Sequence, residues 1–403
     1  MIREVTAIAA TTDVHSAFDN ANPMLSGLHE ARARALVVDC GDYFEGSGFY
    51  RLGRGAIERQ VLTSMYDVIA PGNHGWQHYL EPDIRALTVC ANVVDQQGIP
   101  VFRPLHRTAV GGLNVLVTAV IGEQAFATVP PSHRTGQRAT DPVGALRDLL
   151  LRHHHKTDAW VLLSHSGFEA DLRIAEECPF LDVIFAGHCH SDQYGPAQVG
   201  RTVVVKGHEL GAGYAWAEPA STGWTAHAAR FTDTPTAPAA LAPITELIDS
   251  WRRHLTVPLR PVLPRWQNST PCRATVLQLV AEHLQDRLRV PVLLNETALR
   301  STKLGTTLRV GDLLTIEPFG NQLVHAKIPH RYIDRPEGLI AHLTRHCGPI
   351  TTAPHPLPAG ATHVLTTDYL ATTFLDRYAQ DAGLGLGDSV HRILTTDDER
   401  NRR

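Results

Sequence analysis

The segment from Leu181 to Asp192, which reads LDVIFAGHCHSD, constrains the fold of this chain more than any other segment. Its apolar run Val183–Ala186 predicts a short buried β-strand. The run stops at Gly187, and two imidazoles follow at positions i and i+2, His188 and His190. The segment therefore predicts a strand end that presents two ring nitrogens to one point.

Four other strand-like runs in the first half of the chain end in the same way. They are followed by Asp13 and His15, by Asp42, by Asn73 and His74, and by His165. In layered α/β proteins, ligands collect outside the carboxyl ends of the strands. Five strand ends that carry oxygen or nitrogen ligands therefore predict one shared site.

The first 230 or so residues alternate strand-like runs with segments of helical periodicity. The predicted strands are Val5–Ala9, Ala35–Val38, Asp67–Ala70, Leu113–Val120, Ala159–Leu163, Val183–Ala186 and Thr202–Val205. The predicted helices include Pro23–Arg34 and Pro142–Arg152. This alternation predicts an α/β layered domain.

A segment rich in Thr, Pro and Ala, residues 232–238, predicts a linker after this domain. The apolar residues that follow recur at helical spacing and predict a connecting helix that packs against one or both domains: Ile244, Leu247, Ile248, Trp251 and Leu255.

The last part of the chain reads as α+β. The pair Thr270-Pro271 predicts the N-cap and first turn of a helix that turns Val276, Leu279, Val280 and Leu284 inward. The predicted strands are Val290–Leu294, Leu323–Ile328 and His363–Thr366. We therefore predict one domain at residues 1–232, a linker and connecting helix at 233–256, and a second domain at 257–403.

Composition excludes two classes of partner. The net charge of −4 provides no basic field for a nucleic-acid polymer, and no apolar run approaches the roughly 18 residues of a membrane span. The six Cys are scattered without a C-x-x-C pair, which is typical of reduced thiols, and no secretory signal is visible. We expect a cytoplasmic protein.

The residue types at the strand ends favour transition metals. Asp, Asn and His together suit Mn, Fe or Zn better than Ca or Mg, which prefer oxygen ligands alone. Seven candidate ligands are too many for one ion with open positions, whereas two divalent ions with a bridging carboxylate fit the count. A pair of metals about 3.5–4 Å apart clamps a phosphoryl displacement and generates hydroxide at neutral pH.

The motifs D-x-H, G-D, G-N-H, H and G-H-x-H, in this order, resemble those of the calcineurin-like metallophosphoesterases. Two stretches in the second half, Gly311–Leu314 and Pro318–Asn321, resemble the signature of the 5'-nucleotidase family's C-terminal domain. The resemblance covers nearly the whole chain. It implies a four-layer α/β/β/α metallophosphoesterase domain followed by a smaller α+β domain.

The resemblance also implies roles for the strand-end residues. One ion would be held by Asp13, His15, Asp42 and His190, and the other by Asp42, Asn73, His165 and His188, with Asp42 bridging. The nucleophile would be a hydroxide that bridges the metals. His74 would sit over the phosphate and stabilise the transition state or the leaving group.

For the second domain, the resemblance implies a nucleotide site. The candidate substrate residues are Asn295, Arg300, Phe319, Asn321, Tyr369 and Asp376. The Arg300 guanidinium could pair with phosphate, and the base would stack between Phe319 and Tyr369. Asp376 stands where the family binds the sugar.

Two stretches depart from the family pattern. The usual G-N-H-E-F-D is G-N-H-G-W-Q here, so Gln77 replaces an Asp that normally orients the catalytic His. Because Gln carries no charge to stabilise an imidazolium, we expect His74 to be less basic or differently held. The usual N-G-G-G-I-R is N-E-T-A-L-R, without the glycines at 296–298. These departures predict a changed substrate.

We therefore expect a metal-dependent phosphomonoesterase that acts on a small molecule, the 5'-phosphate of a nucleotide or a nucleotide-like natural-product precursor. Two alternatives remain open: a phosphodiesterase or pyrophosphatase for cyclic nucleotides or nucleotide sugars, and a nucleotide-binding protein with little or no turnover. The sequence leaves open the metal identity, the base preference, the oligomeric state and any rotation of the domains.

Overall fold

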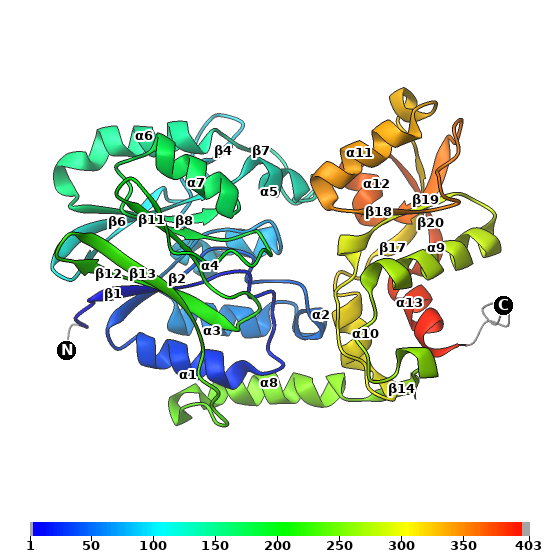
Figure 1. Cartoon of the computed structure of the whole chain (residues 1–403), viewed down its shortest axis with the longest axis horizontal. Helices are drawn as coiled ribbons and strands as arrows, with labels where there is room; N and C mark the ends of the chain where they lie inside the picture. The colour runs from blue at the N-terminus through cyan, green and yellow to red at the C-terminus, as the bar shows by residue number, and fades with distance from the viewer. Residues whose placement is uncertain (1–2, 397–403) are drawn as a thin grey trace. The chain divides into compact units, whose positions relative to one another are not determined.

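The structure, a computed structural model, describes residues 3–396, and the side chains of 376–379 lie outside its description. The chain divides into two compact units (Figure 1). The first comprises Met1–Glu45 and Gly55–Asp249, and the second comprises Gly46–Arg54 and Ser250–Arg403. A short segment from early in the sequence therefore belongs to the second unit. The domain boundaries expected from the sequence stay a prediction.

Two β-sheets form the centre of the first unit. One sheet has the order β13-β12-β1-β2-β3, with β1 (Ala7–Thr11), β2 (Ala35–Asp39), β3 (Val68–Ile69), β12 (Gly213–Ala220) and β13 (Gly223–Arg230). The other has the order β10-β11-β9-β8-β6-β5, with β5 (Leu105–Val110), β6 (Leu113–Ile121), β8 (Ala159–His165), β9 (Val183–Ala186), β10 (Ala197–Val199) and β11 (Thr202–Lys206). A separate antiparallel pair joins β4 (Val93–Asp95) and β7 (Gln137–Ala139).

The two sheets pack face to face over an apolar core. Ile8 and Val38 from the first sheet share this core with Val117, Val161 and Phe185 from the second. Successive residues of a strand point to opposite faces, so the neighbouring alanines of β1 turn to the other side of the first sheet.

Helices cover the outer faces of both sheets (Figure 1). On the first sheet lie α1 (Ala21–Ala31) and α3 (Ala56–Met65), and on the second lie α6 (Pro142–His153) and α7 (Phe168–Glu177). Shorter helices in this part of the sequence are α2 (Gly48–Gly53), α4 (Pro82–Leu87) and α5 (Glu123–Thr128). The predicted four-layer α/β/β/α domain is confirmed.

The second unit is built on one mixed sheet with the order β18-β15-β19-β17-β20. Its strands are β15 (Val292–Asn295), β17 (Gln322–Lys327), β18 (Ile350–Ala353), β19 (His363–Thr367) and β20 (Asp376–Gly385), and β14 (Pro258–Pro261) pairs with β16 (Thr307–Arg309) outside it. The helices α9 (Arg273–Leu288), α10 (Val310–Ile316) and α13 (Leu386–Thr395) share a core with one face of the sheet, and α11 (Pro336–Cys347) and α12 (Asp368–Phe374) with the other. The predicted α+β domain is confirmed.

The helices near the boundary between the two units agree with the sequence predictions, with one difference. The predicted connecting helix is α8 (Ala242–Leu255), in which Ile244 and Ile248 are buried. The helix expected to start at Pro271 instead begins at Arg273. The reason is that Cys272 is its N-cap and keeps an extended backbone, with φ −64° and ψ 126°.

Two further expectations concern the cysteines and membranes. All six Cys are free thiols, as their scattered positions predict. Among the helices within residues 3–396, none combines the length and the apolar character that crossing a bilayer requires.

Candidate metal centre

The parallel strands of each sheet end at a common edge. In the first sheet Thr11 pairs with Asp39, and Asp39 pairs with Ile69. In the second sheet His165 ends β8 beside β6 and β9, which run parallel to it. This register brings the residues that follow these strands together, as their sequence pattern predicts.

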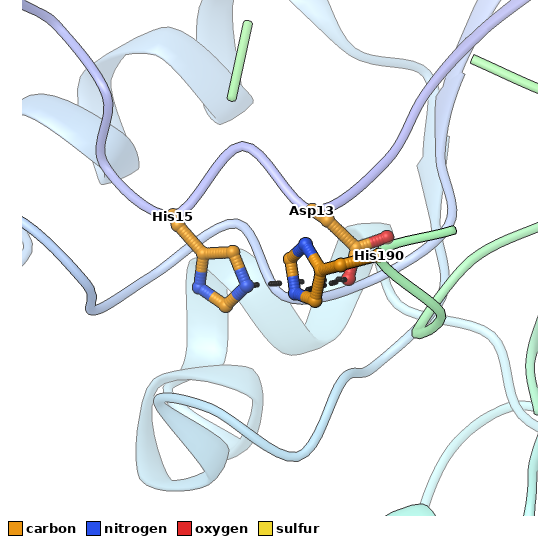
Figure 2. A group of neighbouring side chains, drawn as sticks. All are labelled: Asp13, His15 and His190. Carbon is orange, nitrogen blue, oxygen red and sulfur yellow. Dashed lines mark ion pairs between the residues drawn. The ribbon is translucent and has the colours of Figure 1, made fainter. Parts of the chain in front are cut away.

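The first side-chain cluster contains Asp13, His15 and His190 (Figure 2). The Nε2 atoms of both histidines lie 4.0 Å from Asp13 Oδ1, and the two imidazole rings stack with centroids 5.3 Å apart. One potential ligand atom from each residue lies within 4.8 Å of the others. This spacing is suited to a cation placed among the three side chains.

Asp42 belongs to two further clusters, one with His15 and His74 and one with His165 and His188. Its Oδ2 atom lies 3.8 Å from His15 Nε2 and 3.3 Å from His165 Nε2. One carboxylate therefore stands between two groups of imidazoles, which is the arrangement that a bridging ligand requires.

Hydrogen bonds from the other ring nitrogen orient two of these imidazoles. His165 Nδ1 lies 2.8 Å from the backbone carbonyl oxygen of Cys40, and His15 Nδ1 lies 3.3 Å from that of Glu45. A carbonyl oxygen can only accept, so each Nδ1 donates, and each Nε2 faces the site, where it could bind a cation once it carries no proton. Such partners of the second nitrogen are usual for metal-binding histidines.

Asn73 completes the set of strand-end residues. It is buried, and its Oδ1 lies 3.1 Å from His165 Nε2. The structure thus brings together all seven residues that the sequence predicts as ligands, and their role as ligands stays a prediction.

The backbone at the site is unusual. Asp13, Asp42 and His188 have φ values of 49°, 55° and 73°, in the left-handed region that non-glycine residues rarely occupy. Such strained residues gather at functional sites, where the surrounding packing holds them. At Gly72 a Cβ atom would lie 2.1 Å from the Asp42 backbone nitrogen, so only glycine permits this approach of the two loops.

The charges of the site suit divalent cations. Burial raises the pKa of the Asp13 carboxyl, and burial with the charge of His165 lowers the pKa of His188 to about 3. Burial opposes ionisation of Asp42, but His165 and His74 outweigh it and lower the pKa of that carboxyl. The Oδ1 atom of Asp13 is buried and accepts no hydrogen bond from the described residues. Buried carboxylates beside imidazoles are ligands that a cation would stabilise, so this set fits a metal pair.

Two residues near the site were not singled out from the sequence. Glu45 lies 3.3 Å from His74, and Lys206 is fully buried behind the loop of His188 and His190. The sequence held a signal for each of them. Glu45 shares the loop of Asp42, and a Lys that ends an apolar strand needs acceptors for its ammonium group.

The predicted substrate residues lie in the second unit. Asn295 and Asn321 are buried and donate from Nδ2 to Thr297 Oγ1 and Glu317 Oε1, at 2.7 and 2.9 Å. The Arg300 guanidinium lies 5.6 Å from the ring centroid of Phe319.

Tyr369 packs edge-on against Phe374, with ring centroids 5.9 Å apart. The side chain of Asp376 lies outside the described residues. The roles expected for all six substrate residues stay predictions.

Residues 6–192 match the family model of the calcineurin-like phosphoesterases. Among curated proteins, the chain is 25% identical over 178 residues to an apyrase of Tabanus yao. This match covers 41% of this chain and 31% of that protein. It is 26% identical over 186 residues to a 5'-nucleotidase of Diplobatis ommata. This match covers 41% of this chain and 32% of that protein. The match therefore spans about a third of the length of these relatives.

The whole chain is similar in fold to a solved 5'-nucleotidase precursor of Thermus thermophilus. The TM-score is 0.74 at 17% identity, and the similarity covers 96% of each chain. It supports the two-domain architecture that the sequence motifs imply. Within the N-terminal unit, residues 6–192 are therefore similar to the calcineurin-like phosphoesterases, whose family model they match.

Proposed function

We propose that this protein hydrolyses the 5'-phosphate of a nucleotide or of a nucleotide-like small molecule with the help of two divalent cations. The observation that carries the proposal is the position of Asp42. Its carboxylate lies within 4 Å of His15, which belongs to the cluster with Asp13, and within 4 Å of His165, which belongs to the cluster with His188. A ligand shared by two ions would lie in this way.

The proposal assigns the strand-end residues to two ions, Mn, Zn or Fe. Asp13, His15, Asp42 and His190 would hold one, and Asp42, Asn73, His165 and His188 would hold the other. When bound, such a pair neutralises the phosphate charge and makes a water molecule nucleophilic at neutral pH. The protein supplies the fixed geometry and the ordered backbone around it.

His74 is the proposed catalytic residue beyond the ligands. Its backbone nitrogen donates to Asp42 Oδ1 at 2.8 Å, and its ring lies edge-on to His15 with centroids 5.0 Å apart. About a quarter of its side chain is exposed (26%), so the ring stays accessible to a substrate. It would donate a hydrogen bond to the phosphate or to the leaving oxygen.

The nucleotide part of the proposal rests on the second unit. Arg300 and Phe319 together offer a cation for phosphate and an aromatic face for a base. The 5'-nucleotidase names of the relative and of the structural neighbour are consistent with this assignment. The altered stretches at 75–77 and 296–298 favour a specialised nucleoside phosphate over common ones.

A cytoplasmic location is part of the same proposal. The six free thiols support it, because such thiols persist in a reducing compartment.

An apyrase among the relatives favours a second candidate, cleavage of a phosphoanhydride. The same pair of ions serves both reactions, so the products distinguish them. Attack on a monoester releases only phosphate and a nucleoside, whereas attack on an anhydride leaves a nucleotide.

The test uses the full chain loaded with Mn²⁺ or Zn²⁺. Nucleoside monophosphates, nucleoside diphosphates, a cyclic nucleotide and a nucleotide sugar are incubated with it, and the products are separated. We expect phosphate release from monophosphates, and a loss of at least about 100-fold in Asp42→Asn. The proposal fails if no ester is turned over, or if Asp42→Asn retains full activity.

A further inference from the structure

A carboxylate faces the proposed catalytic imidazole from an unexpected position. Glu45 Oε2 lies 3.3 Å from His74 Nδ1, and each side chain is about one quarter exposed (25% and 26%). The resemblance in sequence places the orienting carboxylate at position 77 instead. Gln77 occupies that position, and its side chain is exposed. The acidic partner of His74 therefore comes from a different loop.

The backbone of this loop carries Glu45 to His74. It follows β2 and turns through left-handed residues, with φ 55° at Asp42 and 63° at Glu45. Between these two residues, Phe44 is fully buried and stacks on the ring of His78 with centroids 4.5 Å apart. Because its neighbour is anchored in this way, the backbone of Glu45 is held close to His74.

Gly75 allows the two loops to approach one another. A Cβ atom at this position would lie 2.4 Å from Phe44 Cβ, closer than two carbon atoms can pack. The related family pattern has a Glu here, which could not be accommodated with Phe44 in its present place. The departure at position 75 and the placement of Glu45 are thus parts of one local arrangement.

Glu45 interacts with two imidazoles. Its carboxylate accepts from His74 Nδ1, and its backbone carbonyl accepts from His15 Nδ1 at 3.3 Å. A carboxylate on Nδ1 keeps the proton there, directs Nε2 away from the partner and stabilises the ring when it becomes positive. A residue that positions a catalytic histidine has these three effects on it.

We propose that Glu45 is the positioning residue of His74 and takes the part that the family gives to the acidic residue at position 77. The inference rests on the proposed phosphatase function. In the reaction, the oxygen of water adds to phosphorus and the ester P–O bond breaks. The departing oxygen takes a proton from His74 Nε2, and a proton from the attacking water restores the imidazole.

The first experiment measures turnover by the full chain loaded with Zn²⁺. Glu45→Gln keeps the shape of the side chain and removes its charge. We expect kcat for a nucleoside 5'-monophosphate to fall about 10- to 100-fold, with KM within about threefold. The loss should be smaller for p-nitrophenyl phosphate, because its leaving group departs without a proton. Gln77→Ala is the matched control and should stay within about twofold of the wild type.

The second experiment does not depend on turnover. Nitrogen NMR of the Zn²⁺-loaded protein with labelled histidine reports the ring proton of each imidazole, and His74→Gln identifies the signals of His74. We expect His74 to carry its proton on Nδ1 in the wild type and in Glu45→Asp. In Glu45→Ala the signals should shift toward a mixture of the two neutral forms.

The outcomes separate this inference from the proposed function. An active wild type with unchanged kcat in Glu45→Gln, or unchanged His74 signals in Glu45→Ala, overturns the role of Glu45 alone. Loss of bound zinc from Glu45→Gln, measured by mass spectrometry, also overturns it, because the residue would then act on the metals. A wild type that turns over no ester overturns the proposed function, even where Glu45 still governs the His74 signals.

Discussion

Lys206 Nζ donates a hydrogen bond of 2.8 Å to the backbone carbonyl oxygen of Cys189. A second bond, of 2.6 Å, goes to the carbonyl of Ser191, so the ammonium holds the backbone on both sides of His190. The Lys206 side chain is fully buried, and its charge is balanced by Glu209 and by the ring face of Tyr194 at 4.9 Å. A buried cation of this kind fixes a loop because its ammonium requires these carbonyl oxygens as partners.

Replacing Lys206 with Met keeps the length of the side chain but leaves those carbonyls without their donor. We expect the affinity for one of the two metals to fall about 10- to 100-fold, because His190 would lose its fixed position. Zinc titration with metal analysis measures the change, and the exposed Lys303→Met is the control. Two tightly bound zinc ions in Lys206→Met would contradict this role.

Removal of divalent cations should lower the melting temperature. A ligand that binds only the folded state at about 100 times its Kd adds about 2.7 kcal/mol of stability. Thermal unfolding with a chelator and then with added Mn²⁺ or Zn²⁺ measures the effect. In Asp13→Asn the gain on adding metal should be smaller. An equal gain in that variant would show that the stabilising ions bind elsewhere.

Glu58 should make the stability pH-dependent. Burial raises the pKa of its carboxyl to about 7, and the Ser16 hydroxyl offsets this only in part. Above the unfolded pKa of 4.5 the unfolded chain loses the proton while the folded chain keeps it, so stability falls as the pH rises toward about 7. One such group contributes a slope of about 1.4 kcal/mol per pH unit.

We therefore expect Glu58→Gln to flatten the fall of the unfolding free energy between pH 4.5 and 7. Denaturant unfolding at several pH values measures the slope, and the exposed Glu30→Gln is the control. If both variants keep the slope of the wild type, Glu58 is ionised in the folded protein.

Gly72→Ala should disrupt the site. The new Cβ would lie 2.1 Å from the backbone nitrogen of Asp42, and the loops would have to separate. Overpacking of this kind lowers the unfolding free energy by about 1–3 kcal/mol, and we expect weaker metal binding as well. Gly305→Ala, where a Cβ meets open space, is the control. Equal stability and metal content in both variants would mean that the loop adapts without cost.

The predicted α/β and α+β halves are confirmed because their pattern is local. Apolar runs and helical spacing report burial within a few residues, so the predicted strand Val183–Ala186 matches β9 at both ends. The predicted start of α9 was wrong because Thr270 and Pro271 favour the start of a helix but do not determine it. The backbone is still extended at Cys272.

The sequence by itself determined the set of strand-end residues that could hold metals. Parallel strands end at one edge, so an ordered row of Asp, Asn and His after successive strands is readable without coordinates. Only the tertiary structure decided what supports them. Glu45 and His74 are 29 residues apart on different loops, and Lys206, at the end of β11, is 17 residues from Cys189. Such pairs depend on how closely distant segments of the chain approach one another, which leaves no periodic signal in the sequence. For Glu45 and His74, packing at Phe44 and Gly75 sets this approach.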